Sequence, residues 1–222
     1  MHTNLKKLEF IQNNINEIVS KKQLKTKPEI IVVTKTFPIE NIIPLLEAGH
    51  LHFGENKIQE AEKKWDKIKK NYINLCLHMV GKLQTNKAKK AVDLFDYIHS
   101  LDNEKLALKI SQYQKELNKD VKLFIQLNLA DEKQKSGLTL NNLKSFYYYC
   151  VNDLKLNIVG LMCLPPIEGN GDKYFKLLNK SAKNLNLSEL SMGMSSDFES
   201  AVINGSTFLR LGTLIMGKRN IT

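Results

Sequence analysis

The sequence predicts an α/β protein in which eight β-strands, nearly all followed by a helix, alternate along the chain. Strict alternation is typical of a parallel sheet with right-handed crossovers. Eight such units need roughly 200–250 residues to close into a (β/α)8 TIM barrel, and this chain has 222 residues. An open doubly wound sheet is the alternative, although it usually contains fewer strands. We therefore expect residues 1–222 to form a single barrel domain with an extra N-terminal helix.

The expected strands are short runs rich in β-branched and apolar residues, bounded by glycine, proline or polar residues. They span residues 30–34, 51–53, 75–80, 97–99, 121–129, 156–162, 187–192 and 208–211. The expected helices carry apolar residues at helical spacing. They span residues 4–21, 38–49, 56–70, 86–92, 103–117, 140–152, 173–186 and 196–204, with a last short helix after 212. A Gly-rich loop follows Pro165 as far as about residue 172.

Three details of this pattern concern how helices begin. Pro44 should kink or shorten its helix, because proline lacks the N–H that a helix interior needs. Asp102 is the expected cap of the helix that follows it, and Thr139 is the expected cap of the next one.

The charge of the chain raises the question of a nucleic-acid partner. The formal net charge is +10, and the isoelectric point is about 9.3. The lysines are spread over many helical segments, whereas a dedicated binder concentrates basic residues on one face, usually with arginines and aromatic residues. Arg210 and Arg219 are the two arginines in the sequence. We therefore expect no nucleic-acid partner.

The composition also bears on where the protein works. Hydrophobic residues make up 42% and charged residues 25% of the chain, as in soluble globular proteins. No apolar stretch approaches the ~20 residues of a membrane span, and the N-terminus lacks the apolar core of a secretory signal. The odd number of cysteines (Cys76, Cys150 and Cys163) suggests reduced thiols. We expect a cytoplasmic protein without a membrane partner.

The stretch at residues 29–38 places a lysine in register with core residues. Side chains alternate along a strand, so Ile31, Val33 and Lys35 share one face. Such a lysine either extends to solvent at the strand end or is held in a site as a nucleophile or charge partner. Barrels gather functional residues at the carboxyl ends of their strands. We therefore favour a functional site for Lys35.

Two helix starts near the end of the sequence predict an anion site. Gly193 and Ser195 precede residues 196–199, Ser-Asp-Phe-Glu, a capping-box pattern that opens a helix. Gly212 and Thr213 open another short helix. The N–H groups and the dipole at helix starts attract anions, and barrels frequently bind phosphate at the loops after strands 7 and 8. We expect a phosphorylated ligand in this mouth of the barrel.

Arg210 lies two residues before Gly212 and could donate to a ring nitrogen, a phosphate or a structural carboxylate. A lysine forms a Schiff base with an aldehyde cofactor once it has lost its proton. Partial burial and nearby positive charge both favour the neutral amine. A phosphate site, Lys35 and Arg210 together suggest pyridoxal 5′-phosphate (PLP), held as a Schiff base on Lys35.

Seven segments of the sequence resemble a known family, the pyridoxal phosphate homeostasis proteins, also called the YggS or proline synthetase co-transcribed family. The matching segments run almost end to end: VVTKTFP, HFGENKIQE, HMVGKLQTNKAK, IHSLDNEKLA, IQLNLADEKQKSGL, GLMCLPP and SMGMSSDFESAVINGSTFLRLGTLIMG. The fifth and the last are highly specific in length and spacing. The resemblance implies a barrel of the alanine racemase N-terminal domain type.

The resemblance also implies roles for individual residues. PLP would be attached to Lys35, and Ser195, Gly212 and Thr213 would contact its phosphate. Arg210 would approach the pyridine nitrogen.

Three further residues match motif positions near the cofactor. Asn56 and His78 would line the site, and Met194 would lie close to it. The sequence departs from the usual family residues at three positions around the mouth, which carry Lys57, Leu77 and Lys82.

The histidines raise the possibility of a metal site. His50 and His52 share one strand face, and Cys76 and His78 share another. No third and fourth ligand follows at a fixed spacing, as a zinc site would need. We expect these histidines to belong to the core or to support the site, and we expect no metal.

Two functions of different classes remain. One is a PLP-binding protein of intracellular PLP (vitamin B6) homeostasis, without turnover and with apo PLP-dependent enzymes as possible recipients. The other is a PLP-dependent amino-acid racemase, which needs proton carriers on both faces of the substrate. Lys35 can serve one face; in alanine racemases a tyrosine of an added β-domain serves the other, and this sequence ends at Thr222 without such a domain. A cation near the pyridine nitrogen would also weaken the electron sink. We expect the first function, and a monomer.

Overall fold

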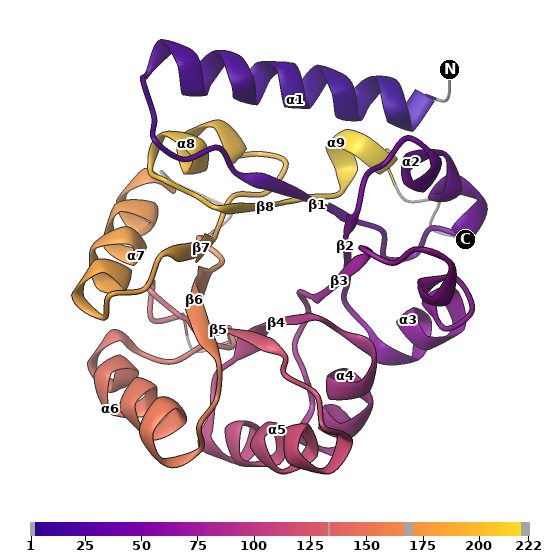
Figure 1. Cartoon of the computed structure of the whole chain (residues 1–222). Coiled ribbons are helices and arrows are strands. Elements are labelled where there is room, and N and C mark those ends of the chain that lie inside the picture. The colour runs from indigo at the N-terminus through magenta and orange to yellow at the C-terminus, as the bar shows by residue number, and fades with distance from the viewer. Residues whose placement is uncertain (1–2, 133, 167–170, 219–222) are drawn as a thin grey trace.

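Eight parallel strands close into a barrel in the order of the sequence, and β1 pairs with β8 to complete the ring (Figure 1). The computed structural model describes residues 3–132, 134–166 and 171–218. The predicted α/β TIM barrel is confirmed. The strands are β1 (Glu29–Val33), β2 (His52–Glu55), β3 (Cys76–Met79), β4 (Tyr97–Leu101), β5 (Lys122–Leu127), β6 (Ile158–Cys163), β7 (Glu189–Ser191) and β8 (Phe208–Leu211).

The helices surround this ring of strands (Figure 1). The predicted N-terminal helix is present as α1, which lies outside β8 and β1 and contacts α8 and α9 (Figure 1). None of the helices in the described ranges is both long and apolar enough to cross a bilayer. The α-helices are α1 (Thr3–Lys21), α2 (Ile43–Glu47), α3 (Ile58–Trp65), α4 (Ala88–Leu94), α5 (Glu104–Leu117), α6 (Leu143–Tyr148), α7 (Asp172–Asn184), α8 (Phe198–Ile203) and α9 (Thr213–Met216).

Several helices are shorter than the sequence predicted. The segment 38–49 divides into a 3-10 turn at Ile39–Asn41 and the five-residue α2, with Pro44 in the first turn of α2. This is the shortening expected from a proline without an N–H donor. The segment 140–152 divides into the 3-10 turn Leu140–Asn142, α6 and the π-helical turn Tyr149–Asp153. Within the predicted Gly-rich loop, residues 167–170 lie outside the described residues.

Two predicted helix caps are wrong. The cap of α5 is Asn103 rather than Asp102, because the Asn103 side chain accepts a hydrogen bond from the backbone N–H of Leu106 at 2.9 Å. Thr139 precedes a 3-10 turn and makes no side-chain capping bond. A single-residue shift of this kind cannot be read from sequence, since Asp and Asn are equally good caps.

The strands separate two cores of different chemistry. Side chains that point outward pack against the helices, and large apolar residues such as Phe53, Trp65 and Leu77 are fully buried there. Side chains that point inward fill the barrel, where an apolar cluster contains Ile31, Phe124, Met162 and Phe208. Alternation along each strand produces this division.

Candidate functional site

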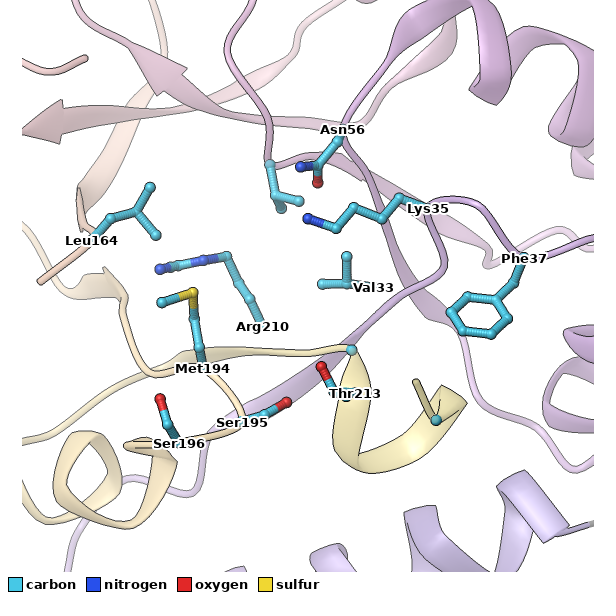
Figure 2. Close-up of a pocket in the computed structure, with 13 residues that line it drawn as sticks. Val33, Lys35, Phe37, Asn56, Leu164, Met194, Ser195, Ser196, Arg210 and Thr213 are labelled. Atoms are coloured by element: carbon cyan, nitrogen blue, oxygen red, sulfur yellow. The ribbon is translucent and has the colours of Figure 1, made fainter. Parts of the chain in front are cut away.

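A cavity of about 480 Å³ opens at the carboxyl ends of the strands (Figure 2). All of the predicted site residues except His78 line it, from the ends of β1, β2, β7 and β8. Lys35 and Arg210 both extend into it, Asn56 lies beside Lys35, and Ser195 and Thr213 lie at its lower edge (Figure 2). Its lining consists of Val33, Lys35, Phe37, Asn56, Val80, Leu164, Met194, Ser195, Ser196, Arg210, Gly212, Thr213 and Gly217.

Lys35 lies in the turn that follows β1, two residues beyond Val33 on the same face. The prediction that its side chain shares a face with Val33 is confirmed, since both line the cavity. Its neighbour Thr36 has a φ of 68°, a left-handed conformation that is strained for a β-branched residue. The N–H of Thr36 donates to the Glu60 carboxylate, which fixes this turn against α3.

The backbone before Lys35 is held by a buried polar cluster. The Nζ atom of Lys64 donates to the carbonyl oxygen of Thr34 at 2.8 Å and to Glu55 at 2.7 Å. Glu55 is fully buried and also accepts from the Thr34 hydroxyl at 2.7 Å and from the Trp65 indole at 3.0 Å. All three bonds reach the same carboxylate oxygen of Glu55, Oε1, and they offset part of the cost of burying this charge pair. The turn that carries Lys35 is thus anchored on both sides.

The loop between β7 and α8 forms the opposite edge of the predicted anion site. Gly193 has a φ of 91°, which glycine adopts without strain. The predicted capping box is wrong: α8 begins at Phe198, and Asp197 instead accepts from the backbone N–H of Met194 at 2.6 Å. Its carboxylate therefore closes the loop rather than capping the helix. This loop presents the hydroxyl of Ser195 to the cavity.

The start of α9 completes this edge. The N–H of Leu214 points to the Ser195 hydroxyl oxygen at 3.4 Å, so the loop after β7 and the helix after β8 meet at this point. Gly212 precedes α9, and Thr213 is its first residue. Backbone N–H groups of a first helical turn lack partners within the helix. Together with two hydroxyl groups they can hold an anion.

Arg210 of β8 is 5% exposed. Its Nη1 donates to the Ser191 hydroxyl at 2.6 Å and its Nη2 donates to the Cys163 carbonyl at 2.9 Å. The ion pairs found among the described residues do not include Arg210. Burial lowers its pKa to about 10, and the group remains a cation at neutral pH. A buried cation held by two neutral acceptors has donors left for a ligand.

The predicted residues fall into two groups. The cavity brings together Lys35, Asn56, Met194, Ser195, Arg210, Gly212 and Thr213. His78 lies elsewhere: it is fully buried inside the barrel, below the cavity, and its ring stacks on Tyr97 at 4.5 Å between ring centroids. Sequence reasoning did not include Ser191, which contacts Arg210 directly. The available signal was a polar residue at an inward position of a short strand.

The histidines contact one another inside the barrel. His52 and His78, which the sequence placed on separate faces, lie with ring nitrogens 3.0 Å apart. Within the described part of the chain, no group of three or more histidine, cysteine, aspartate or glutamate residues could hold a metal ion.

The geometry agrees with comparisons to known proteins. A family model described as the alanine racemase N-terminal domain matches residues 7–220. A pyridoxal phosphate homeostasis protein of Synechocystis sp. is 38% identical over 219 residues, which cover 95% of this chain and 99% of that protein. The chain belongs to the pyridoxal phosphate homeostasis protein family. The resemblance inferred from the seven sequence segments is confirmed.

Solved structures add the fold and a ligand seen in a relative. The structure of PipY from Synechococcus elongatus contains bound PLP. PipY is 34% identical to this chain, with a TM-score of 0.79, and the match covers 91% of this chain and 100% of PipY. An alanine racemase of Clostridium difficile is 13% identical, with a TM-score of 0.72, and the match covers 97% of this chain and 57% of the racemase. This chain thus shares its barrel fold with the racemase, and at this identity the likeness concerns the fold alone.

Proposed function

We propose that this chain binds pyridoxal 5′-phosphate in the cavity at the ends of β1, β7 and β8, as a Schiff base with Lys35. Its role would be in intracellular PLP homeostasis, without catalytic turnover. One observation carries this proposal: a lysine amine, a buried arginine and a hydroxyl-lined helix start enter the same cavity. The PLP-bound relative PipY supports the choice of ligand.

The residues fit the three chemical parts of PLP. Lys35 offers the amine that an aldehyde needs. Ser195 and Thr213, with the N–H groups at the start of α9, suit a phosphate. Arg210 offers donors to the pyridine nitrogen. A cavity of about 480 Å³ is within the range of small-cofactor sites.

When bound, PLP supplies an electron-withdrawing ring and an aldehyde for amines. The surrounding residues determine whether that chemistry is used. Among the described lining residues, Lys35 carries the one side-chain amine that could exchange a proton with a substrate carbon. Racemisation needs a second carrier on the other face. Arg210 also opposes protonation of the ring nitrogen, which weakens the ring as an electron sink. Both features support a carrier over the alternative, a racemase.

Chemical trapping tests the attachment. Purified full-length protein loaded with PLP should give, after borohydride reduction and peptide mapping, an adduct on Lys35. Lys35→Ala should lose the adduct, whereas Lys57→Ala should keep it, because Lys57 is exposed and lies outside the cavity. A wild-type adduct mainly on another lysine would overturn the assignment.

The carrier role has its own measurements. The loaded protein should exchange the α-hydrogen of common amino acids with deuterium no faster than free PLP; steady exchange with turnover would restore the racemase. We also propose apo PLP-dependent enzymes as recipients and a monomeric barrel as the carrier. Reactivation of an apo enzyme faster than by free cofactor, together with the mass from light scattering, tests both.

A further inference from the structure

A continuous chain of hydrogen bonds runs through the barrel interior from Arg210 to the opposite end. It links four strands besides β8, and we call it the interior chain: Ser191 of β7, His99 of β4, His78 of β3 and His52 of β2. Successive distances are 2.6 Å from Arg210 Nη1 to Ser191 Oγ, 2.7 Å from Oγ to His99 Nδ1, 2.9 Å from His99 Nε2 to His78 Nδ1, and 3.0 Å from His78 Nε2 to His52 Nδ1.

Arg210 favours one direction for every bond in the interior chain. A guanidinium only donates, so the Ser191 oxygen must accept from it. The same oxygen could also accept from His99, but the Ser191 hydrogen would then lose its acceptor; with His99 Nδ1 as the acceptor, that hydrogen is paired. His99 then carries its proton on Nε2 and donates to His78. By the same logic His78 donates from its Nε2 to Nδ1 of His52. Three neutral histidines are thereby assigned one tautomer each, with the outward N–H on His52.

The packing keeps these rings in place. His99 stacks on Phe124 with ring centroids 4.3 Å apart and 13° between planes, and His78 stacks on Tyr97 at 4.5 Å and 15°. Both histidines are fully buried. Burial lowers the pKa of His78 and of His99 well below the usual value, and for His99 the charge of Arg210 acts in the same direction. The neutral forms of His78 and His99, which the interior chain requires, are thus favoured.

We propose that the interior chain positions the guanidinium of Arg210 at the cavity and makes that position depend on the protonation of His52. The Ser191 hydroxyl is the direct contact, and the histidines hold that hydroxyl in the accepting orientation. The effect of the interior chain on a bound cofactor rests on the proposed function. The tautomers of the histidines and the position of Arg210 do not depend on that function.

His52 is the end of the interior chain that meets solvent, because its side chain is only half-buried. A protonated His52 has no lone pair on Nδ1 to accept from His78. The hydrogen bonds of the interior chain can persist only if His78 and His99 each move their proton to the other ring nitrogen. The Ser191 oxygen would then accept from both His99 and Arg210, and its hydrogen would lose its acceptor. Acid at the far end therefore weakens the support of Arg210.

The surroundings of His52 set where this occurs. Burial lowers the pKa of His52 from its usual value near 6.5; Glu29 and Asp96 raise it, and Lys122 lowers it. Burial lowers the pKa of the neighbouring His50 to about 4, so its ring stays neutral above that pH. The change should therefore begin below about pH 6.5. The titratable and charged groups near His52 are Glu29, His50, Cys76, His78, Asp96, Tyr97 and Lys122.

Nitrogen NMR of the wild-type chain without ligand tests the tautomers directly. At about pH 8, where His52 is neutral, His99 and His78 should each show a protonated Nε2 and a bare Nδ1. The opposite tautomer at His99 would overturn the proposal, and no variant is needed for this measurement. If the tautomers agree but the protein fails to bind PLP, the interior chain stands and the proposed function fails.

Variants test the positioning. Ser191→Ala should raise the Kd for PLP about tenfold, the usual cost of a lost hydrogen bond to a charged group. Ser191→Thr, which retains the hydroxyl, should recover most of the lost affinity for PLP. His50→Phe is the matched control, because the His50 ring contacts the backbone carbonyl of His52 and no side chain of the interior chain. This variant should bind PLP as the wild type does.

A pH profile separates this role from a merely structural one. In wild-type protein the Kd for PLP should rise below about pH 6.5 more steeply than in His52→Asn, whose amide oxygen can replace Nδ1 as acceptor but does not titrate. His52→Leu lacks the acceptor and should bind weakly at every pH. Identical profiles for wild type, His52→Asn and His52→Leu would overturn the proposal, even if all three fold equally well.

Discussion

The two cores of this barrel are built by opposite faces of the same strands, yet they differ in chemistry. The outer core, between strands and helices, consists mainly of aliphatic and aromatic side chains such as Leu77 and Ile110. The interior contains His78 and His99 among stacked aromatic rings and connects to the buried cation Arg210. An apolar core needs volume and shape, whereas a polar interior also needs a partner for every donor and acceptor.

The difference shows where this protein places its chemical specificity. In the outer core, a polar cluster around Glu55 and Lys64 anchors the turn that carries Lys35. In the interior, the histidines support Arg210 through Ser191. Both arrangements end at the same cavity. A fold that could have been filled with valine, isoleucine and leucine thus uses polar groups where they hold the site.

Acid should destabilise the fold through the interior histidines rather than through the outer core, and this is the largest effect we expect. The pKa values of His78 and His99 are depressed in the folded chain by burial, so the unfolded chain binds more protons below about pH 6.5. Stability is therefore complete above that pH and falls by about 1.4 kcal/mol per pH unit for each such histidine. Urea unfolding at several pH values between about 7 and 5 checks this; a flat profile over that window would contradict it.

Truncation of a large outer-core residue should come next. Trp65 is fully buried, packs on Phe53 with ring centroids 5.2 Å apart, and donates to Glu55. Trp65→Ala should lower the free energy of unfolding by about 3–5 kcal/mol through the cavity that it leaves. Trp65→Phe should lose less, and the loss should be independent of pH between about 7 and 5, unlike that of the interior. Denaturant titrations of both variants provide the measurement.

A conservative change on the inward face gives the smallest effect and the sharpest comparison. Ile31 and Val32 are adjacent and fully buried, with Ile31 in the interior cluster and Val32 in the outer core. Ile31→Val should cost about 1 kcal/mol and leave PLP binding nearly unchanged, because the Ile31 side chain does not line the cavity and makes no hydrogen bond of the interior chain. A loss of binding that exceeds the loss of stability would mean that the whole interior, rather than its polar chain, positions Arg210.

Sequence reasoning located most of the cavity because its signals are local. Lys35 could be assigned to the same face as Val33 from alternation alone. The residues of the RLGT segment could be assigned to a helix start from their glycine and hydroxyl, whereas the SMGMS residues lie in the loop before α8, because the predicted capping box does not form. His78 could not be placed, because a motif position near a strand end does not say how far below the mouth the side chain lies.

The sequence by itself determined the eight-unit barrel, the family and the gathering of Lys35, Ser195 and Arg210 at one end. Alternation, helix starts and motif spacing depend on neighbours along the chain. Only the tertiary structure decided that Arg210 is held by Ser191 and that three histidines continue the contact. Those contacts join residues 19, 92, 21 and 26 positions apart. They exist because closure of the barrel turns the inward faces of five strands toward one another.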